Sequence, residues 1–153
     1  MSIDARLAEL GLDLPGPYPP HDPLDPVVIH GGVARTSGQL PRNADGNLVH
    51  PGRLGDALTT EQGAEAAHWC ALNALSVLAA ELGSLDRIER VLTVLGFVAC
   101  TPDFLEQPAV VDGASRLLRD VFGDAGRHSR SAIGVAALPR GGAVEIEVAV
   151  ALR

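Results

Sequence analysis

The chain has 153 residues, of which 46% are hydrophobic and 20% are charged, a composition that fits one globular domain with a substantial core. Its 12 Lys and Arg residues and 19 Asp and Glu residues give a net charge of −7, with no evident cluster of basic side chains. Because nucleic-acid binding depends on such clusters, the composition disfavours DNA or RNA as a partner.

The first 26 residues are predicted to form a short helix and an irregular arm. Residues 4–10 have amphipathic spacing, and the glycine that follows them favours the end of a helix. Residues 14–23 are rich in proline, which removes backbone donors and fixes φ, so they are not expected to form regular structure. We interpret residues 1–153 as a single domain with this N-terminal extension.

An early hairpin is predicted from two apolar segments, residues 27–30 and 33–39, separated by Gly31-Gly32. The asparagine- and glycine-containing segment 43–47 indicates a turn. The stretch from there to Asp56 has no periodicity, which is typical of a surface loop.

The first long helix is predicted to begin at Thr59 or Thr60 and to end at Gly83. Thr59 and Gln62 have the spacing of a capping box, in which each side chain bonds the other residue's backbone N–H. Its apolar residues recur at helical spacing, so one face is expected to pack inward.

A strand and a second helix follow. Residues 87–100 are β-branched and almost continuously apolar, which indicates an internal, central strand that ends before Pro102. Pro108 suits the first turn of a helix, and apolar residues then repeat at helical spacing until Gly123.

The last 25 residues are predicted to form a β-hairpin with its turn at residues 140–142. Its second arm alternates, with one face formed by Val144, Ile146, Val148, Val150 and Leu152 and the other by Ala143, Glu145, Glu147, Ala149 and Ala151. In such a hairpin Arg130, on the first arm, is expected to project towards the same side as Glu145 or Glu147.

This order of elements predicts an α+β fold in which two helices cover only one face of a sheet. The other face would carry Ala143, Ala149 and Ala151. Since large uncovered apolar surfaces generally mark interaction sites, we expect a symmetric oligomer that buries this face.

Several other chemistries have no support in the sequence. Cys70 and Cys100 both lie in apolar segments, which indicates buried thiols in a reducing compartment. The five histidines lack zinc-like spacing, and neither a phosphate-binding loop nor a nucleophile elbow occurs. No apolar stretch is long enough to cross a bilayer uninterrupted. We expect no metal, no cofactor, no membrane partner and a cytoplasmic location.

The segments Arg130-Ser131 and Glu145-Ile146-Glu147 resemble those of the RidA/YjgF family, formerly described as endoribonuclease L-PSP. The same family order continues in Gly16-Pro17-Tyr18, in 36–41 and in 96–104, so the resemblance covers residues 16–153, as a longer variant. It implies a chorismate-mutase-like α+β fold, assembled as a homotrimer around a central barrel with ligand clefts between subunits.

The resemblance also implies roles for four residues. Arg130 would bind the carboxylate of a small imine or enamine acid, and Glu145 would position the attacking water or relay its proton. Tyr18 and Ser37 would line the cleft. From the residues alone, alternatives stay open, because Arg130 can form a structural ion pair with Glu145 or Glu147, and Tyr18 can anchor the proline-rich arm.

The chain departs from the family pattern at two positions near the proposed site. Asp112 falls near the place where related chains often carry asparagine, so either it points away from the cleft or the substrate differs. Ala132 replaces a cysteine that is common after Arg-Ser, which removes a thiol from the site. His128 is the one histidine near the site, and it is interpreted as a solvated loop residue, with general-base chemistry as the alternative.

Three functions from different classes remain. The first is a deaminase that hydrolyses enamine or imine acids of the 2-aminoacrylate type to ketoacids and ammonia. The second is a non-catalytic trimer that binds small carboxylates or ketoacids through Arg130. The third is an endoribonuclease, which the acidic net charge disfavours.

Overall fold

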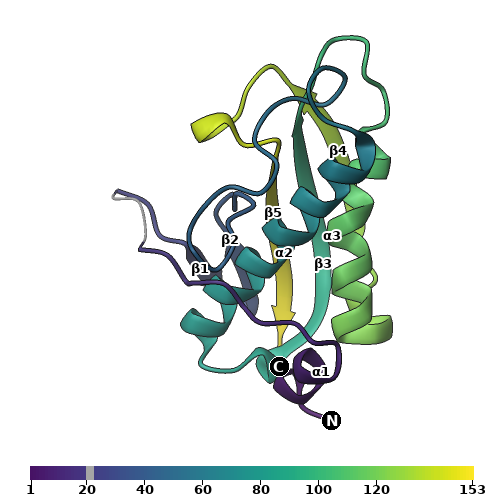
Figure 1. Ribbon diagram of the computed structural model, residues 1–153. Helices are drawn as coiled ribbons and strands as arrows, with labels where there is room; N and C mark the ends of the chain where they lie inside the picture. Colours follow the sequence, from purple (N-terminus) through teal and green to yellow (C-terminus); the bar gives the residue numbers. More distant parts are fainter. Residues whose placement is uncertain (20–22) are drawn as a thin grey trace.

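In the computed structural model, which describes residues 1–19 and 23–153, one five-stranded sheet carries two long helices on a single face (Figure 1). The strand order is β1-β2-β5-β3-β4, with bounds β1 Val27–His30, β2 Val33–Thr36, β3 Ile88–Ala99, β4 Ser129–Val135 and β5 Val144–Leu152. The α-helices are α1 Ile3–Glu9, α2 Thr60–Leu82 and α3 Gln107–Phe122, and short 3-10 turns span Leu85–Arg87, Gly123–Gly126 and Pro139–Gly141. Of the predicted proline-rich arm, Pro20, His21 and Asp22 lie outside the described residues.

The N-terminal hairpin is confirmed. Strands β1 and β2 pair antiparallel, from Val27 opposite Thr36 to His30 opposite Val33. Both turn glycines have positive φ, 58° at Gly31 and 74° at Gly32, as a two-residue turn between twisted strands requires.

The predicted helices are also confirmed. At the start of α2, Thr59 accepts a hydrogen bond from the Gln62 backbone and donates its own N–H to the Gln62 side chain, and Gly83 ends the helix in the left-handed conformation. Helix α3 carries Pro108 in its first turn and ends at Gly123. None of the helices within the described residues has the length and apolar character needed to cross a membrane.

The predicted C-terminal hairpin is wrong, because β4 and β5 are not neighbours. Strand β3 lies between them, parallel to β4 and antiparallel to β5. Parallel strands need a crossover connection, and α3 supplies it between β3 and β4. The chain then returns through the turn Pro139–Gly141 and places β5 on the other side of β3, where it becomes the central strand.

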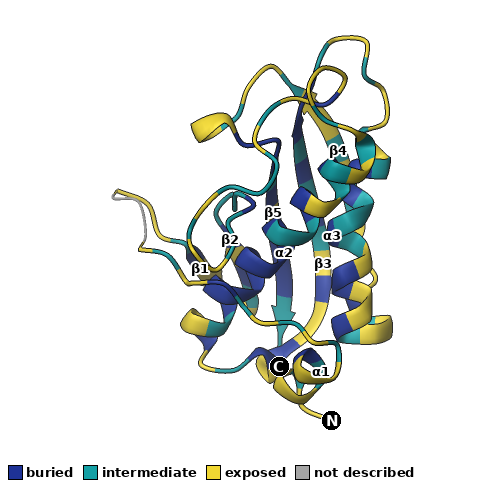
Figure 2. Cartoon of the chain, in the orientation of Figure 1, coloured by how far each residue is buried: buried dark blue, intermediate teal, exposed yellow. Residues whose placement is uncertain are grey.

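The core lies between the sheet and the two long helices, as predicted. Helix α2 packs on β5, and α3 packs on β3 and β4. Figure 2 shows the buried residues gathered where these layers meet. The helices touch closely, since a Cβ at Gly113 of α3 would lie 1.9 Å from the carbonyl oxygen of Ala64 in α2. Large side chains with almost no exposed area fill the interior, among them Leu75, Leu78, Val91, Val94, Val98, Val111, Leu118 and Ile146.

Within the described residues no helix lies over the second face of the sheet, but two of its three alanines are better covered than predicted. Ala143 and Ala149 are already buried within one chain, so they do not need a partner to cover them. The apolar side chains that remain on this open face are larger: Val28 is 56% exposed, Ile133 is 44% exposed, and Phe97 is half-buried. The apolar surface that a partner would cover therefore centres on these residues.

Candidate active site

Arg130 lies at the start of β4, on the edge of the sheet, and its side chain points towards α3. It stands in register with Val94, which is fully buried beneath the helices. Its Nη1 lies 2.8 Å from Oδ1 of Asp112 and donates to Oγ of Ser115 at 3.2 Å. Its Nη2 donates to the carbonyl oxygen of Pro108 at 3.2 Å. Arg130 is thus bound to three positions on one face of α3.

Asp112 therefore points directly at Arg130. Its other carboxylate oxygen, Oδ2, lies 3.7 Å from Nη2 of Arg116 one turn further along the helix. The alternative reading of Arg130 as a structural ion-pair residue matches these contacts, but the predicted partners are wrong. Asp112 takes the place that the sequence assigned to Glu145 or Glu147.

Glu145 lies on the opposite face of the sheet from Arg130. Residues that share a register across a sheet project to the same side. Arg130, Val94 and Val148 share one register, on the helix side, whereas Glu145 pairs with Phe97 on the open side. The expectation that Arg130 projects towards the same side as Glu145 or Glu147 is therefore wrong within one chain, because it assumed that β4 and β5 are adjacent.

The Glu145 carboxyl is half-buried against the segment that follows β2. A Cβ at Gly38 would lie 2.7 Å from Cδ of Glu145, so glycine leaves the room that this carboxyl occupies. Two backbone hydrogen bonds between Gln39 and Ile146, of 2.9 and 3.0 Å, hold the two segments together. Burial raises the pKa of the Glu145 carboxyl, and the negative charge of Glu147 raises it further. A carboxyl whose pKa is raised in this way keeps its proton to a higher pH than an exposed carboxyl does, which favours a role in proton transfer.

Ser37 lies in the same segment as Gly38 and belongs to a small polar cluster. The Gln39 side-chain amide donates to Oγ of Ser37 at 3.3 Å and to its carbonyl oxygen at 3.2 Å. The structure thus brings Ser37 and Glu145 to one region, on either side of Gly38.

Tyr18 contacts the turn at residues 43–47. Its hydroxyl donates a hydrogen bond to the carbonyl oxygen of Asn43, and the Arg42 guanidinium lies over its ring, 5.6 Å from the centroid. These are the contacts of an aromatic anchor for the N-terminal arm, the alternative reading of this residue.

His128 and Ser115 extend the network around Arg130. The His128 Nδ1 lies 2.6 Å from the carbonyl oxygen of Gly126 and its Nε2 lies 2.9 Å from Oγ of Ser115. Because a carbonyl only accepts, Nδ1 carries the proton, and in the neutral ring Nε2 accepts from the Ser115 hydroxyl. His128 is therefore engaged through both ring nitrogens and is not the solvated residue that the sequence suggested.

Sequence reasoning missed Ser115 entirely. Pro108, Asp112 and Ser115 are spaced at i, i+4 and i+7, which places them on one helical face, and this spacing was an available signal. Ala132 lies beyond Arg130 on the helix-facing side of β4 and brings no thiol to the network. Cys70 and Cys100 are buried and unpaired, as predicted.

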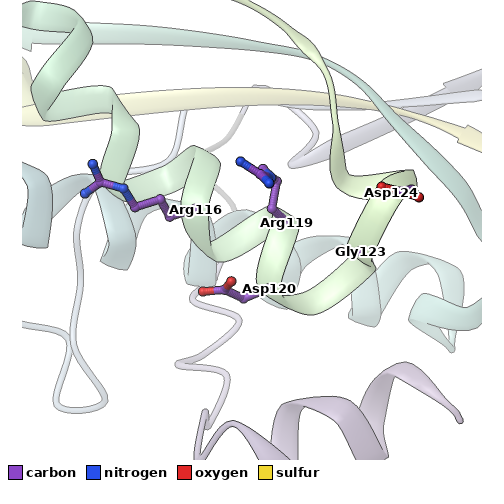
Figure 3. Close-up of a pocket in the computed structure, with 5 residues that line it drawn as sticks. All are labelled: Arg116, Arg119, Asp120, Gly123 and Asp124. Carbon is purple, nitrogen blue, oxygen red and sulfur yellow. The ribbon is translucent and has the colours of Figure 1, made fainter.

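Two hollows on the surface add little to the candidate site. On the open face, Arg35, Thr93, Ser131 and Glu147 line a shallow hollow of about 290 Å³. At the C-terminal end of α3, Arg116, Arg119, Asp120 and Asp124 surround a second one, but Figure 3 shows that their side chains do not converge. Within the described residues, no group of three or more His, Cys, Asp or Glu side chains is placed to hold a metal ion.

Comparison with known proteins places the chain in one family. Residues 4–146 match the family model described as "YjgF/chorismate mutase-like, putative endoribonuclease". Protein TCP17 of Trypanosoma cruzi is 44% identical over 98% of this chain and 94% of its own length. Among solved structures, Atu1372 of Agrobacterium tumefaciens, of unknown function, superposes with a TM-score of 0.90 at 39% identity, covering 99% of this chain and 92% of that one. A "putative endoribonuclease" of Shewanella oneidensis MR-1 superposes with a TM-score of 0.94 at 32% identity, over 99% of this chain and all of the other.

Proposed function

Since the chain belongs to the YjgF/RidA family, we propose that it catalyses the hydrolytic deamination of small enamines and imines. The observation that carries the proposal is Glu145, a half-buried carboxyl with a raised pKa, packed over a glycine that leaves it room. Such a group can accept a proton from water and return it within one reaction cycle.

In the proposed reaction, Glu145 takes a proton from water as the water oxygen attacks the imine carbon. The C=N bond becomes a C–N single bond, and the nitrogen receives a proton. That first proton is returned by Glu145. Glu145 then takes the hydroxyl proton of the adduct and passes it to the nitrogen, so ammonia leaves as the C=O bond forms. The balance is one imine and one water giving one carbonyl compound and one ammonia, so the step requires no oxidant or reductant.

We place this reaction in a cleft between subunits of a homotrimer. Arg130 and Glu145 project from opposite faces of the sheet, so a shared site would need Arg130 of one subunit and Glu145 of its neighbour. The open face also supports assembly, because Val28 and Ile133 are apolar and exposed in the single chain. Ser37 would lie beside Glu145, and Tyr18 would contribute through the position of the N-terminal arm.

The test compares Glu145→Gln with Glu147→Gln, the same substitution two residues along the same face of β5. Imines are generated in place by an amino-acid oxidase or an amine oxidase, and ammonia release is followed with and without the protein. We expect Glu145→Gln to lower turnover by about a hundredfold or more, the usual scale for a lost acid–base group. Glu147→Gln should retain most of the activity.

The experiment also decides between enzyme and binder. Equal deamination rates for wild type and Glu145→Gln over several imines would show that Glu145 is structural and would favour the non-catalytic binding protein. We regard ribonuclease activity as the weakest candidate, because a net charge of −7 repels the phosphate backbone.

A further inference from the structure

We infer that Asp112 sets the substrate class of the proposed site, by neutralising Arg130 so that the cleft takes small imines or enamines without a carboxylate group. The inference rests on the proposed function and changes its substrate, since the family resemblance alone implied imine acids. It depends on the charges and donors around Arg130.

The first step is the charge balance. Oδ1 of Asp112 lies 2.8 Å from Nη1 of Arg130, and the two side chains are 40% and 21% exposed. Two opposite charges at this distance and this degree of burial present little net charge to a third group. A ligand carboxylate would meet the repulsion of Asp112 together with the attraction of Arg130.

The second step is the supply of N–H donors. A guanidinium has five, and a firm grip on a carboxylate uses two parallel ones. Arg130 already makes three hydrogen bonds. Its Nη1 donates to Asp112 and to Ser115, and its Nη2 donates to the carbonyl oxygen of Pro108. Nη1 is therefore fully used, and a carboxylate that bound through Nη1 would have to displace Asp112. The donors left for a ligand are Nε and the second hydrogen of Nη2, beside the negative charge of Asp112.

The third step is what the remaining donors can do. An uncharged carbonyl or imine group needs a single hydrogen bond and is not repelled by Asp112. Arg116 adds only a weak positive charge here: its Nη2 lies 3.7 Å from Asp112, but its side chain is 72% exposed, and solvent screens an exposed charge. The local chemistry thus favours a neutral ligand over an anionic one.

The test uses two ligands of nearly the same shape that differ in charge: pyruvate and its amide, pyruvamide. Their dissociation constants are measured by calorimetry or ligand-observed NMR on the intact protein. For wild type we expect pyruvamide to bind at least as tightly as pyruvate. This comparison needs no variant, so it stands even if a substitution disturbs folding.

The variant is Asp112→Asn, which keeps an acceptor oxygen for Arg130 and removes the charge. We expect it to tighten pyruvate binding roughly tenfold or more, with little change for pyruvamide. The matched control is Asp124→Asn, which removes an equal charge from a fully exposed position beyond the end of α3 and should leave both constants unchanged.

The inference is overturned if wild type binds pyruvate clearly more tightly than pyruvamide, if Asp112→Asn leaves pyruvate binding unchanged, or if neither ligand binds to any form. Failure of the proposed reaction gives a different result: the pyruvamide preference and the effect of Asp112→Asn persist, while imines from amino acids and imines from simple amines are both hydrolysed at the uncatalysed rate.

Discussion

Two influences act in the same direction on the Glu145 carboxyl. Burial raises its pKa from the usual 4.5, and the charge of Glu147 adds to the shift. In the unfolded chain the same carboxyl is hydrated and ionises near its usual value. The native state therefore holds an ionised Glu145 at a cost, and that cost develops as pH rises from 4.5 through the higher folded-state pKa.

This sign gives a stability prediction for Glu145→Gln. At neutral pH the substitution removes a poorly solvated charge, so we expect a slightly higher Tm than wild type. Well below pH 4.5 the carboxyl is protonated in both states, and the difference should disappear. Thermal unfolding at neutral and acidic pH checks this.

The control for that prediction is the activity assay on the same preparation. A variant that loses activity without losing stability would separate lost chemistry from lost folding. A clearly lower Tm at neutral pH would show instead that Glu145 makes a stabilising contact.

Also at the scale of single residues, the sequence could identify Asp112 as unusual, but it could not predict the contact of Asp112 with Arg130. From the amino-acid sequence alone, Asp112 is expected to depart from the family pattern. Its direction could not be predicted, because the approach of Asp112 to Arg130 depends on how α3 packs against β4. Residue spacing within one element carries no such information.

At the scale of elements, most of the secondary structure could be predicted, and the strand neighbours could not. Thr59, Gln62 and Gly83 marked the ends of α2 by local chemistry, and alternation marked β5. A period of two assigns side chains to faces, but it does not say which strand lies beside which. Strand β3 lies between β4 and β5 because the chain crosses over through α3. That connection is a feature of the tertiary structure, which the pattern within each strand does not encode.

The close crossing of α2 and α3 leads to a packing prediction. In an exposed helix, Gly→Ala is stabilising. Gly113→Ala should instead destabilise the chain by about 1–3 kcal/mol, because its Cβ would meet the Ala64 carbonyl at 1.9 Å. Urea denaturation measures the change. The control is Arg116→Ala on the same helix, whose side chain is 72% exposed, with an expected effect within about 0.5 kcal/mol.

A neutral or stabilising Gly113→Ala would mean that the two helices separate easily. In that case Asp112, the preceding residue, would also be free to shift relative to Arg130.

At the scale of the whole molecule, the open face of the sheet indicates an oligomer, and the number of subunits, three, is what the family resemblance implies. Light scattering should give a mass three times the 15.9 kDa of one chain. Ile133→Glu places a charge on the exposed apolar part of this face and should dissociate the trimer, while the single chain stays folded.

The matched control is Leu105→Glu. Leu105 is 79% exposed but lies in the loop before α3, away from the open face. A trimer that survives Ile133→Glu, or a wild-type chain that is monomeric at micromolar concentration, would contradict the proposed shared cleft.

The Arg130 network also has a consequence for local opening. Among the strands that the structure describes, β4 lies at the edge of the sheet and has β3 as its one neighbour. Hydrogen bonds from Arg130 to Asp112, Ser115 and Pro108 fasten this strand to the helix that precedes it. Asp112→Asn weakens these contacts, so we expect faster amide hydrogen exchange in β4, while the amides of β5 keep their protection. The residue proposed to determine ligand class would then also control how often the edge of the sheet opens.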